Sequence, residues 1–193
     1  MPDVSQYNYK SSAYIDFKFF RGQPGSDKAV NITANLDNLK EIVDDVIAES
    51  ELFSTYSFDQ SKLESGAKHV KIHLYNHGNF VLAALSGAIS GVSMGVIPAY
   101  AKDKYTLICE LEDAEKPFSH QNDDAVSTWM GWIFLPFAGN TPKKALRSTL
   151  ENQLKDALQK LVESGQLEYS NKQQPAAINR FLVGTGRLTH CAA

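Results

Sequence analysis

Cysteine is scarce in this chain, its net charge is weak, and its lysines are scattered apart from the pair Lys143 and Lys144. The two cysteines, Cys109 and Cys191, are too few for a disulfide scaffold or a tetrahedral zinc site. A net charge of -3 offers no basic surface that would neutralise nucleic-acid phosphates. The chain also lacks a P-loop, a nucleophile elbow and a CxxC pair. We therefore expect no cofactor, no metal ion, no nucleic-acid partner and no enzymatic activity.

A secretory signal is also missing from the first residues, MPDVSQYNYKSS, which have neither a basic start nor an apolar core. This start is typical of a cytoplasmic protein, and equally of an exported protein whose signal has been replaced by a starting methionine. The composition, 43% hydrophobic and 21% charged, is ordinary for a folded protein. We expect a flexible segment at 1–12, one domain at 13–165, and a polar tail at 166–193 that adds a short terminal strand.

Alternation of apolar and polar residues predicts several strands. The clearest are 13–20, 69–75 and 104–112, and the last of these puts Cys109 on its more apolar face. The apolar segment 128–137 is too short to cross a bilayer as a helix, so we interpret it as a strand that ends at Pro136.

Two segments have the apolar spacing of three and four residues that predicts amphipathic helices. The first covers 35–50, with Asn35 as its N-cap. The second covers 142–164; Thr141 and Pro142 suit its N-terminus, and Gly165 its C-terminal stop. Together the elements predict an α/β (α+β) fold, in which one mixed or antiparallel sheet of four to five strands carries both helices on one face.

The histidines are the first candidates for chemistry, because His69, His73 and His77 recur every four residues. On a strand, a step of four residues covers about 13 Å, too far for two ligands of one zinc ion. We therefore expect surface histidines on a wet sheet face. If the chain binds a small ligand or acts as an enzyme, we expect His69, His73 and Tyr75 to line a concave pocket.

The carboxylates and the first cysteine give weaker signals. Glu110, Glu112, Asp113 and Glu115 form one acidic group and Asp123 and Asp124 another, both in segments that we expect to be solvated loops. Cys109 has the position of a buried core thiol, and a nucleophilic cysteine needs partial exposure and a nearby base.

The feature that stands out is an uncharged run, FVLAALSGAISGVSMGVIPAY, from Phe80 to Tyr100. As a helix it places Gly87, Gly91 and Gly95 on one ridge, which would allow a second helix to approach closely. As strands, the run relies on its β-branched residues Ile89, Val92, Val96 and Ile97, and Pro98 ends it. Both interpretations stay open, with burial against protein preferred to membrane contact.

Part of this run resembles a known family. The segment 91–98, GVSMGVIP, followed by Tyr105-Thr-Leu and later by Trp129 and Leu135-Pro, is similar to a pattern in small envelope lipoproteins of Gram-negative bacteria, most of unassigned function. The resemblance extends over 70–161. It implies a periplasmic protein anchored at the outer membrane, whose signal and lipid-bearing cysteine this chain lacks.

We therefore expect a non-catalytic envelope protein that acts as a structural or interaction subunit, with other envelope proteins or further copies of itself as partners. The expected contact surface is apolar and consists of Gly87, Gly91, Gly95, Ile97, Trp129 and Trp132. Two alternatives are a ligand-binding protein that uses the histidine-bearing strand, and an oligomer that inserts the run 80–100 into a membrane.

Overall fold

The structure is a computed structural model that describes residues 3–34, 36–63, 65–78, 80–112, 117–132 and 141–170. The predicted N-cap Asn35, the end of the expected strand at 128–137 and most of the tail lie outside these ranges. Residues 80–81 and 141–143 are described by their backbone alone.

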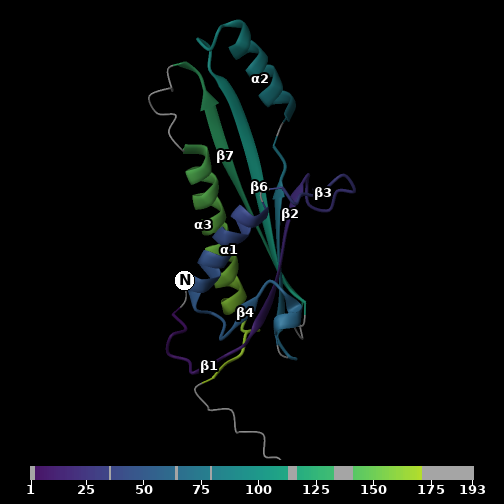
Figure 1. Ribbon diagram of the computed structural model, residues 1–193, viewed down its shortest axis with the longest axis vertical. Coiled ribbons are helices and arrows are strands. Elements are labelled where there is room, and N and C mark those ends of the chain that lie inside the picture. Colours follow the sequence, from purple (N-terminus) through teal and green to yellow (C-terminus); the bar gives the residue numbers. More distant parts are fainter. Residues whose placement is uncertain are drawn as a thin grey trace, which may run out of the picture.

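Six strands form one mixed sheet in the described part of the chain (Figure 1). The order across it is β3 (Val30–Asn31), β2 (Ala13–Arg21), β5 (Lys68–Asn76), β6 (Ala99–Leu111) and β7 (Phe118–Met130), with β4 (Tyr56–Ser57) also beside β2. β2 is parallel to β4 and β5, and the other pairs are antiparallel. The predicted class is confirmed, and the strand number was set too low.

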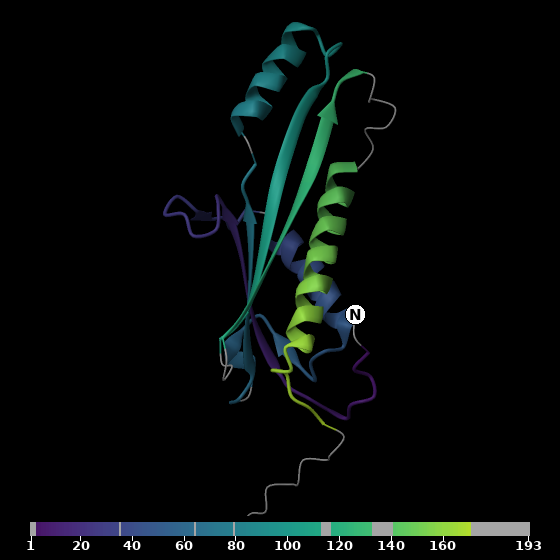
Figure 2. The same ribbon diagram turned by 180° about the vertical axis from the view of Figure 1, so that it is seen from behind.

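Two helices cover one face of this sheet, as predicted (Figures 1 and 2). α1 (Leu36–Ser50) lies between β2 and β5 in the chain and α3 (Thr141–Glu163) follows β7. Gly165 has the positive φ of 69° and donates its N–H to the carbonyl of Val162, which confirms the expected stop after α3. The core between helices and sheet is apolar and includes Ile15, Val43, Ile47, Ile72, Leu107, Cys109, Leu154 and Leu158.

The beginning and the end of the described chain are held together. β1 (Tyr9–Lys10) pairs with β8 (Tyr169–Ser170) in a small antiparallel sheet, and the rings of Tyr7 and Tyr169 stack at 5.4 Å. Part of the segment 1–12 is thus paired with the start of the segment 166–193. A short 3-10 helix, η1 (Gln60–Lys62), precedes β5.

β6 and β7 are longer than the strands beside them. Pairing between β5 and β6 ends at Asn76 with Tyr105, whereas β6 and β7 stay paired up to Ala99 with Met130. Beyond β5 the hairpin projects from the rest of the molecule, together with the helix α2 (Phe80–Val92) (Figures 1 and 2). We call this part the distal arm; it consists of residues 80–104 and 125–132.

Two sequence expectations need correction here. The run from Phe80 is a helix up to Val92 and joins β6 only at Ala99, so the strand alternative is wrong for most of it. β6 extends to Leu111 and β7 begins at Phe118, so Glu110, Asp123 and Asp124 lie within strands and not in loops, whereas Asp113 and Glu115 lie outside the described residues. The polar residues of β7 hid its alternation, because one of its faces is open to water.

A buried glutamine joins α3 to the two strands where the distal arm begins. Gln153 is 2% exposed, and its Nε2 donates to the carbonyl oxygens of Tyr105 on β6, at 3.0 Å, and of Asn122 on β7, at 3.1 Å. One side chain therefore fixes the distance between the helix and both strands.

We expect Gln153→Ala to lower the free energy of unfolding by about 1–3 kcal/mol, because the carbonyls of Tyr105 and Asn122 lose this donor. Urea denaturation measures the change. Gln159→Ala is the matched control on the same helix: Gln159 is exposed and bonded only to Glu163, at 2.9 Å. Equal effects of the two substitutions would contradict this role of Gln153.

Candidate functional site

The helix α2 is oriented opposite to most surface helices, with its two serines toward the protein and its large apolar residues toward solvent. The half-buried residues are Ala83, Ser86 and Ser90. The exposed ones recur at spacings of three and four residues and so form one stripe. They are Leu82, Leu85, Ile89 and Val92, which are 44%, 59%, 47% and 89% exposed.

The sheet explains why serine faces inward. α2 follows β5 in the chain and runs beside the part of β6 that β5 no longer covers (Figures 1 and 2). The N–H of Tyr100 in this uncovered part donates to the hydroxyl oxygen of Ser86, at 2.5 Å. A helix beside a free strand edge must supply such acceptors, because the edge N–H groups otherwise lack partners.

The turn between α2 and β6 closes against a tryptophan. Gly95 has φ of +82°, and a Cβ at this position would lie 2.5 Å from Cδ1 of Trp132. The indole Nε1 of Trp132 donates to the carbonyl oxygen of Met94. Only glycine allows this close approach of ring and backbone.

Further apolar side chains surround this turn. Trp129 lies beside Tyr100 with the ring centroids 4.7 Å apart, and Trp132 is 66% exposed. Other exposed apolar residues at this end of the arm are Met94, Val96, Ile97 and Met130. We call the exposed apolar residues of α2, the 93–98 turn, Trp129, Met130 and Trp132 the apolar tip.

The apolar tip is also free of charge. No charged residue occurs between Phe80 and Ala101 or between Ala125 and Trp132. Charges resume with Lys102, Asp103 and Lys104 on β6 and with Asp124 and Asp123 on β7. Since Lys102 is paired with Ser127, and Tyr105 with Asp124, charge begins three residues nearer to the tip on β6 than on β7.

All six residues of the predicted apolar surface lie on the distal arm, but they play different parts. A side chain added at Gly87 or Gly91 on α2 would meet open space, so these glycines make no close helix contact within the described chain. Gly95 lies beyond the helix and packs against Trp132. Ile97 and Trp129 are each 53% exposed.

The sequence pattern of the run 80–100 did not lead us to predict the outward apolar stripe of α2. Its sequence signal is the spacing of Ala83, Ser86 and Ser90, which marks the inward side of the helix. The glycine spacing drew attention to a ridge that the described chain does not use.

The histidine-bearing face of β5 is the side of the sheet without helices. The ring of His69 lies 4.8 Å from Tyr14, and Phe20 contacts both His73, at 5.4 Å, and Tyr75, at 4.9 Å. His69 Nδ1 lies 2.5 Å from a carboxylate oxygen of Glu112. The three predicted residues thus form a row along the strand.

This row does not converge on one cavity. A cavity of about 350 Å³ at its end is lined by Tyr14 and His69 but not by His73 or Tyr75. His77 is engaged elsewhere, with Nε2 2.7 Å from the hydroxyl oxygen of Thr106. The described residues contain no group of three or more His, Cys, Asp or Glu side chains that could hold a metal ion.

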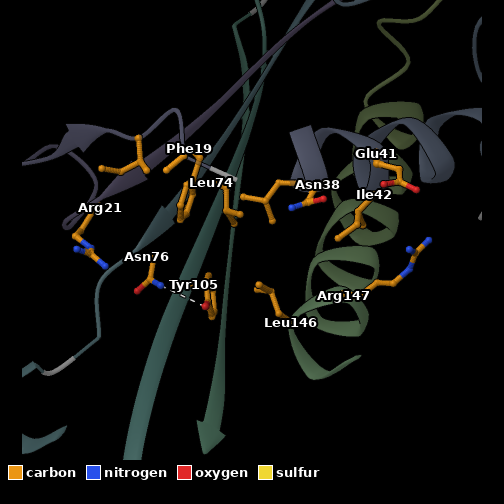
Figure 3. A pocket seen from close by; sticks show the side chains of 13 residues that line it. Phe19, Arg21, Asn38, Glu41, Ile42, Leu74, Asn76, Tyr105, Leu146 and Arg147 are labelled. Carbon is orange, nitrogen blue, oxygen red and sulfur yellow. Dashed lines mark hydrogen bonds between the residues drawn. The ribbon is translucent and has the colours of Figure 1, made fainter. Parts of the chain in front are cut away.

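A larger cavity of about 810 Å³ opens on the helix side, between α1, α3 and the sheet (Figure 3). The residues at the floor of this cavity are buried: Leu74 is 1% exposed and Leu39 is 6% exposed. Arg147 at its edge is bound by Asp45, at 2.5 Å, and by Glu151, at 2.7 Å. The lining of the cavity is mainly apolar and comes from α1, α3 and the sheet, and we assign no ligand to it.

Cys109 is the buried core thiol that the strand alternation predicted. It is 1% exposed, and burial raises its pKa to about 12. A thiol that stays protonated in the core does not act as a nucleophile.

We expect Gly95→Ala to loosen the turn, because the new methyl group would displace the indole of Trp132 and the residue would keep a positive φ. Hydrogen exchange of residues 93–98 should become faster. Gly87→Ala is the control: it meets open space on α2 and should stabilise the helix by up to about 1 kcal/mol. Unchanged exchange in Gly95→Ala would show that this contact does not hold the turn.

His73 should make the protein less stable in mild acid. Burial lowers its pKa below the usual 6.5, with Asp16 opposing the shift. The unfolded chain therefore binds the proton more readily, so the contribution is complete above pH 6.5 and is lost as the pH falls toward the folded-state pKa. We expect the melting temperature to fall less between pH 7 and pH 5 in His73→Phe than in the wild type. Parallel pH curves would contradict the shift.

Comparisons with known proteins include a structural likeness. No protein-family model matches the chain, and no curated protein matches it. Among solved structures, the chain is similar to the rare lipoprotein B from Shewanella oneidensis, with 6% sequence identity and a TM-score of 0.45. The likeness covers 80% of this chain and 96% of that one.

Proposed function

We propose that this protein is a non-catalytic component of a bacterial cell envelope that acts through contacts of its apolar tip. The observation that carries this proposal is the outward apolar stripe of α2. Among the exposed large apolar residues of the described chain, only Val30 lies away from the distal arm.

The apolar tip is too concentrated for an ordinary solvated surface. Single exposed apolar residues are normal on soluble proteins, whereas a contiguous group marks a site of contact with another molecule or a membrane. Covering such a group gains about 25 cal/mol for each Å² of apolar surface removed from water. A partner that covers this tip is therefore bound chiefly by the hydrophobic effect.

The envelope location is supported by the sequence resemblance described above. The segment that carries it, 91–98, forms the turn of the apolar tip, so the family-like pattern and the contact surface coincide. None of the helices in the described part of the chain combines the length and the apolarity needed to cross a membrane.

We expect the triple substitution Leu85→Ser, Ile89→Ser and Val92→Ser to move the protein from the envelope to the soluble fraction of lysed host cells. The folded body should keep its stability, because the three side chains are exposed. Val30→Ser is the matched control, since Val30 is 58% exposed on β3. Retention of the triple variant in the envelope fraction would exclude the tip as the contact surface.

A further inference from the structure

We propose that the partner of the apolar tip is the surface of a lipid bilayer, into which the tip inserts to the level of the headgroups. This inference rests on the proposed function and names the partner of the same site. Three features of the distal arm carry it: the state of its backbone, its length and shape, and the position of its charges.

The backbone N–H groups of the exposed turn are all bonded internally. Ser93, Met94 and Gly95 donate to carbonyls of α2, and Val96 donates to the carbonyl of Ser93. Ile97 donates to the Ser93 hydroxyl, at 3.0 Å, and the next residue is proline, which has no N–H. In water, an N–H group of a turn can donate to solvent. In hydrocarbon, each N–H group without an acceptor costs several kcal/mol of free energy.

The side chains of the tip follow the same pattern. The Ser86 hydroxyl accepts from Tyr100, the Ser93 hydroxyl donates to the carbonyl of Ser90, and the Trp132 indole donates to Met94. Protein interfaces usually form about one hydrogen bond per 100–200 Å². The outward stripe of α2 presents aliphatic side chains only, and this favours lipid over a protein partner.

The length and shape of the arm suit an interface. α2 has 13 residues, about 20 Å at 1.5 Å per residue, too short for a hydrocarbon core of about 30 Å. The tip forms the end of a projecting arm (Figures 1 and 2). A projecting apolar end enters a fluid layer readily, whereas a protein partner would need a matching cavity.

The charges set a limit to insertion. Lys102, Asp103 and Lys104 lie within the distal arm, beside Ala83 near the start of α2, and Asp123 and Asp124 lie where the arm joins the sheet; all five would stay in water. Two positive and three negative groups leave a net charge of -1 there. Tyr100 and Trp129, which are paired across the two strands, lie between these charges and the apolar end, as aromatic residues do at membrane interfaces. Binding should therefore depend little on anionic lipid.

The two tryptophans provide a label-free test, because the chain contains no others. We expect the purified protein to float with vesicles of phosphatidylcholine, and equally with vesicles that contain phosphatidylglycerol, at low and at high salt. Tryptophan emission should shift to shorter wavelength on binding. Lipids brominated near the headgroup end of the acyl chain should quench it more than lipids brominated near the chain end.

Leu85→Ser with Ile89→Ser should lower the vesicle partition coefficient about tenfold or more, since two apolar side chains are lost from the inserted surface. Val30→Ser should leave it unchanged. Circular dichroism and melting curves confirm that each variant is folded.

Three results would overturn the inference. Unshifted tryptophan emission and no flotation of the folded wild type would exclude bilayer insertion; if envelope retention in cells still depended on the tip, the partner would be a protein and the proposed function would stand. Self-association that the tip substitutions abolish, without vesicle binding, would make a second copy the partner. If the tip substitutions changed neither envelope retention in cells nor flotation with vesicles, both the proposed function and the bilayer inference would be wrong.

Discussion

The pairing of β6 with β7 beyond the end of β5 is the constraint on which the distal arm depends. It leaves one edge of β6 without a neighbouring strand over about 20 Å at 3.4 Å per residue. α2 has about the same length and lies beside this edge. The helix must then turn residues such as Ser86 toward the strand, so its large apolar residues have only the outer side left. The outward stripe is thus a consequence of how the sheet ends.

The rest of the sheet provides a stiff base for this arm. The parallel pairing of β2 with β5 and the antiparallel pairing of β5 with β6 are covered on one face by α1 and α3. Gln153 holds α3 to both arm strands where they leave the sheet. The arm is therefore continuous with the core through its strands, and the buried Gln153 attaches the base of the arm to α3.

The body of the fold could be predicted from periodicity, and the arm only in part. α1 and α3 each have one apolar stripe, and Gly165 marks the end of the second helix, so these elements and the strands around 13–20 and 69–75 were found. β7 was misjudged at Asp123 and Asp124, because a strand edge open to water tolerates carboxylates that look like a loop. α2 could not be assigned, since its outer side is apolar and it has no charged face to reveal its period. The six predicted contact residues all lie on the distal arm, but the reason for the exposure of this arm depends on where β5 ends, which sequence spacing does not show.

Met94 combines a strained backbone conformation with an exposed apolar side chain. Gly95 donates to the carbonyl of Ser90 and Met94 to that of Gly91, which is the pattern of a Schellman motif. Met94 therefore occupies the left-handed position, with φ of 51°, where glycine is preferred. Glycine there would relieve the strain but would remove an apolar side chain that is 81% exposed. A strained backbone kept at an exposed apolar residue is expected where that side chain has a partner. The same turn places glycine at the next residue, where the indole of Trp132 leaves no room for a side chain.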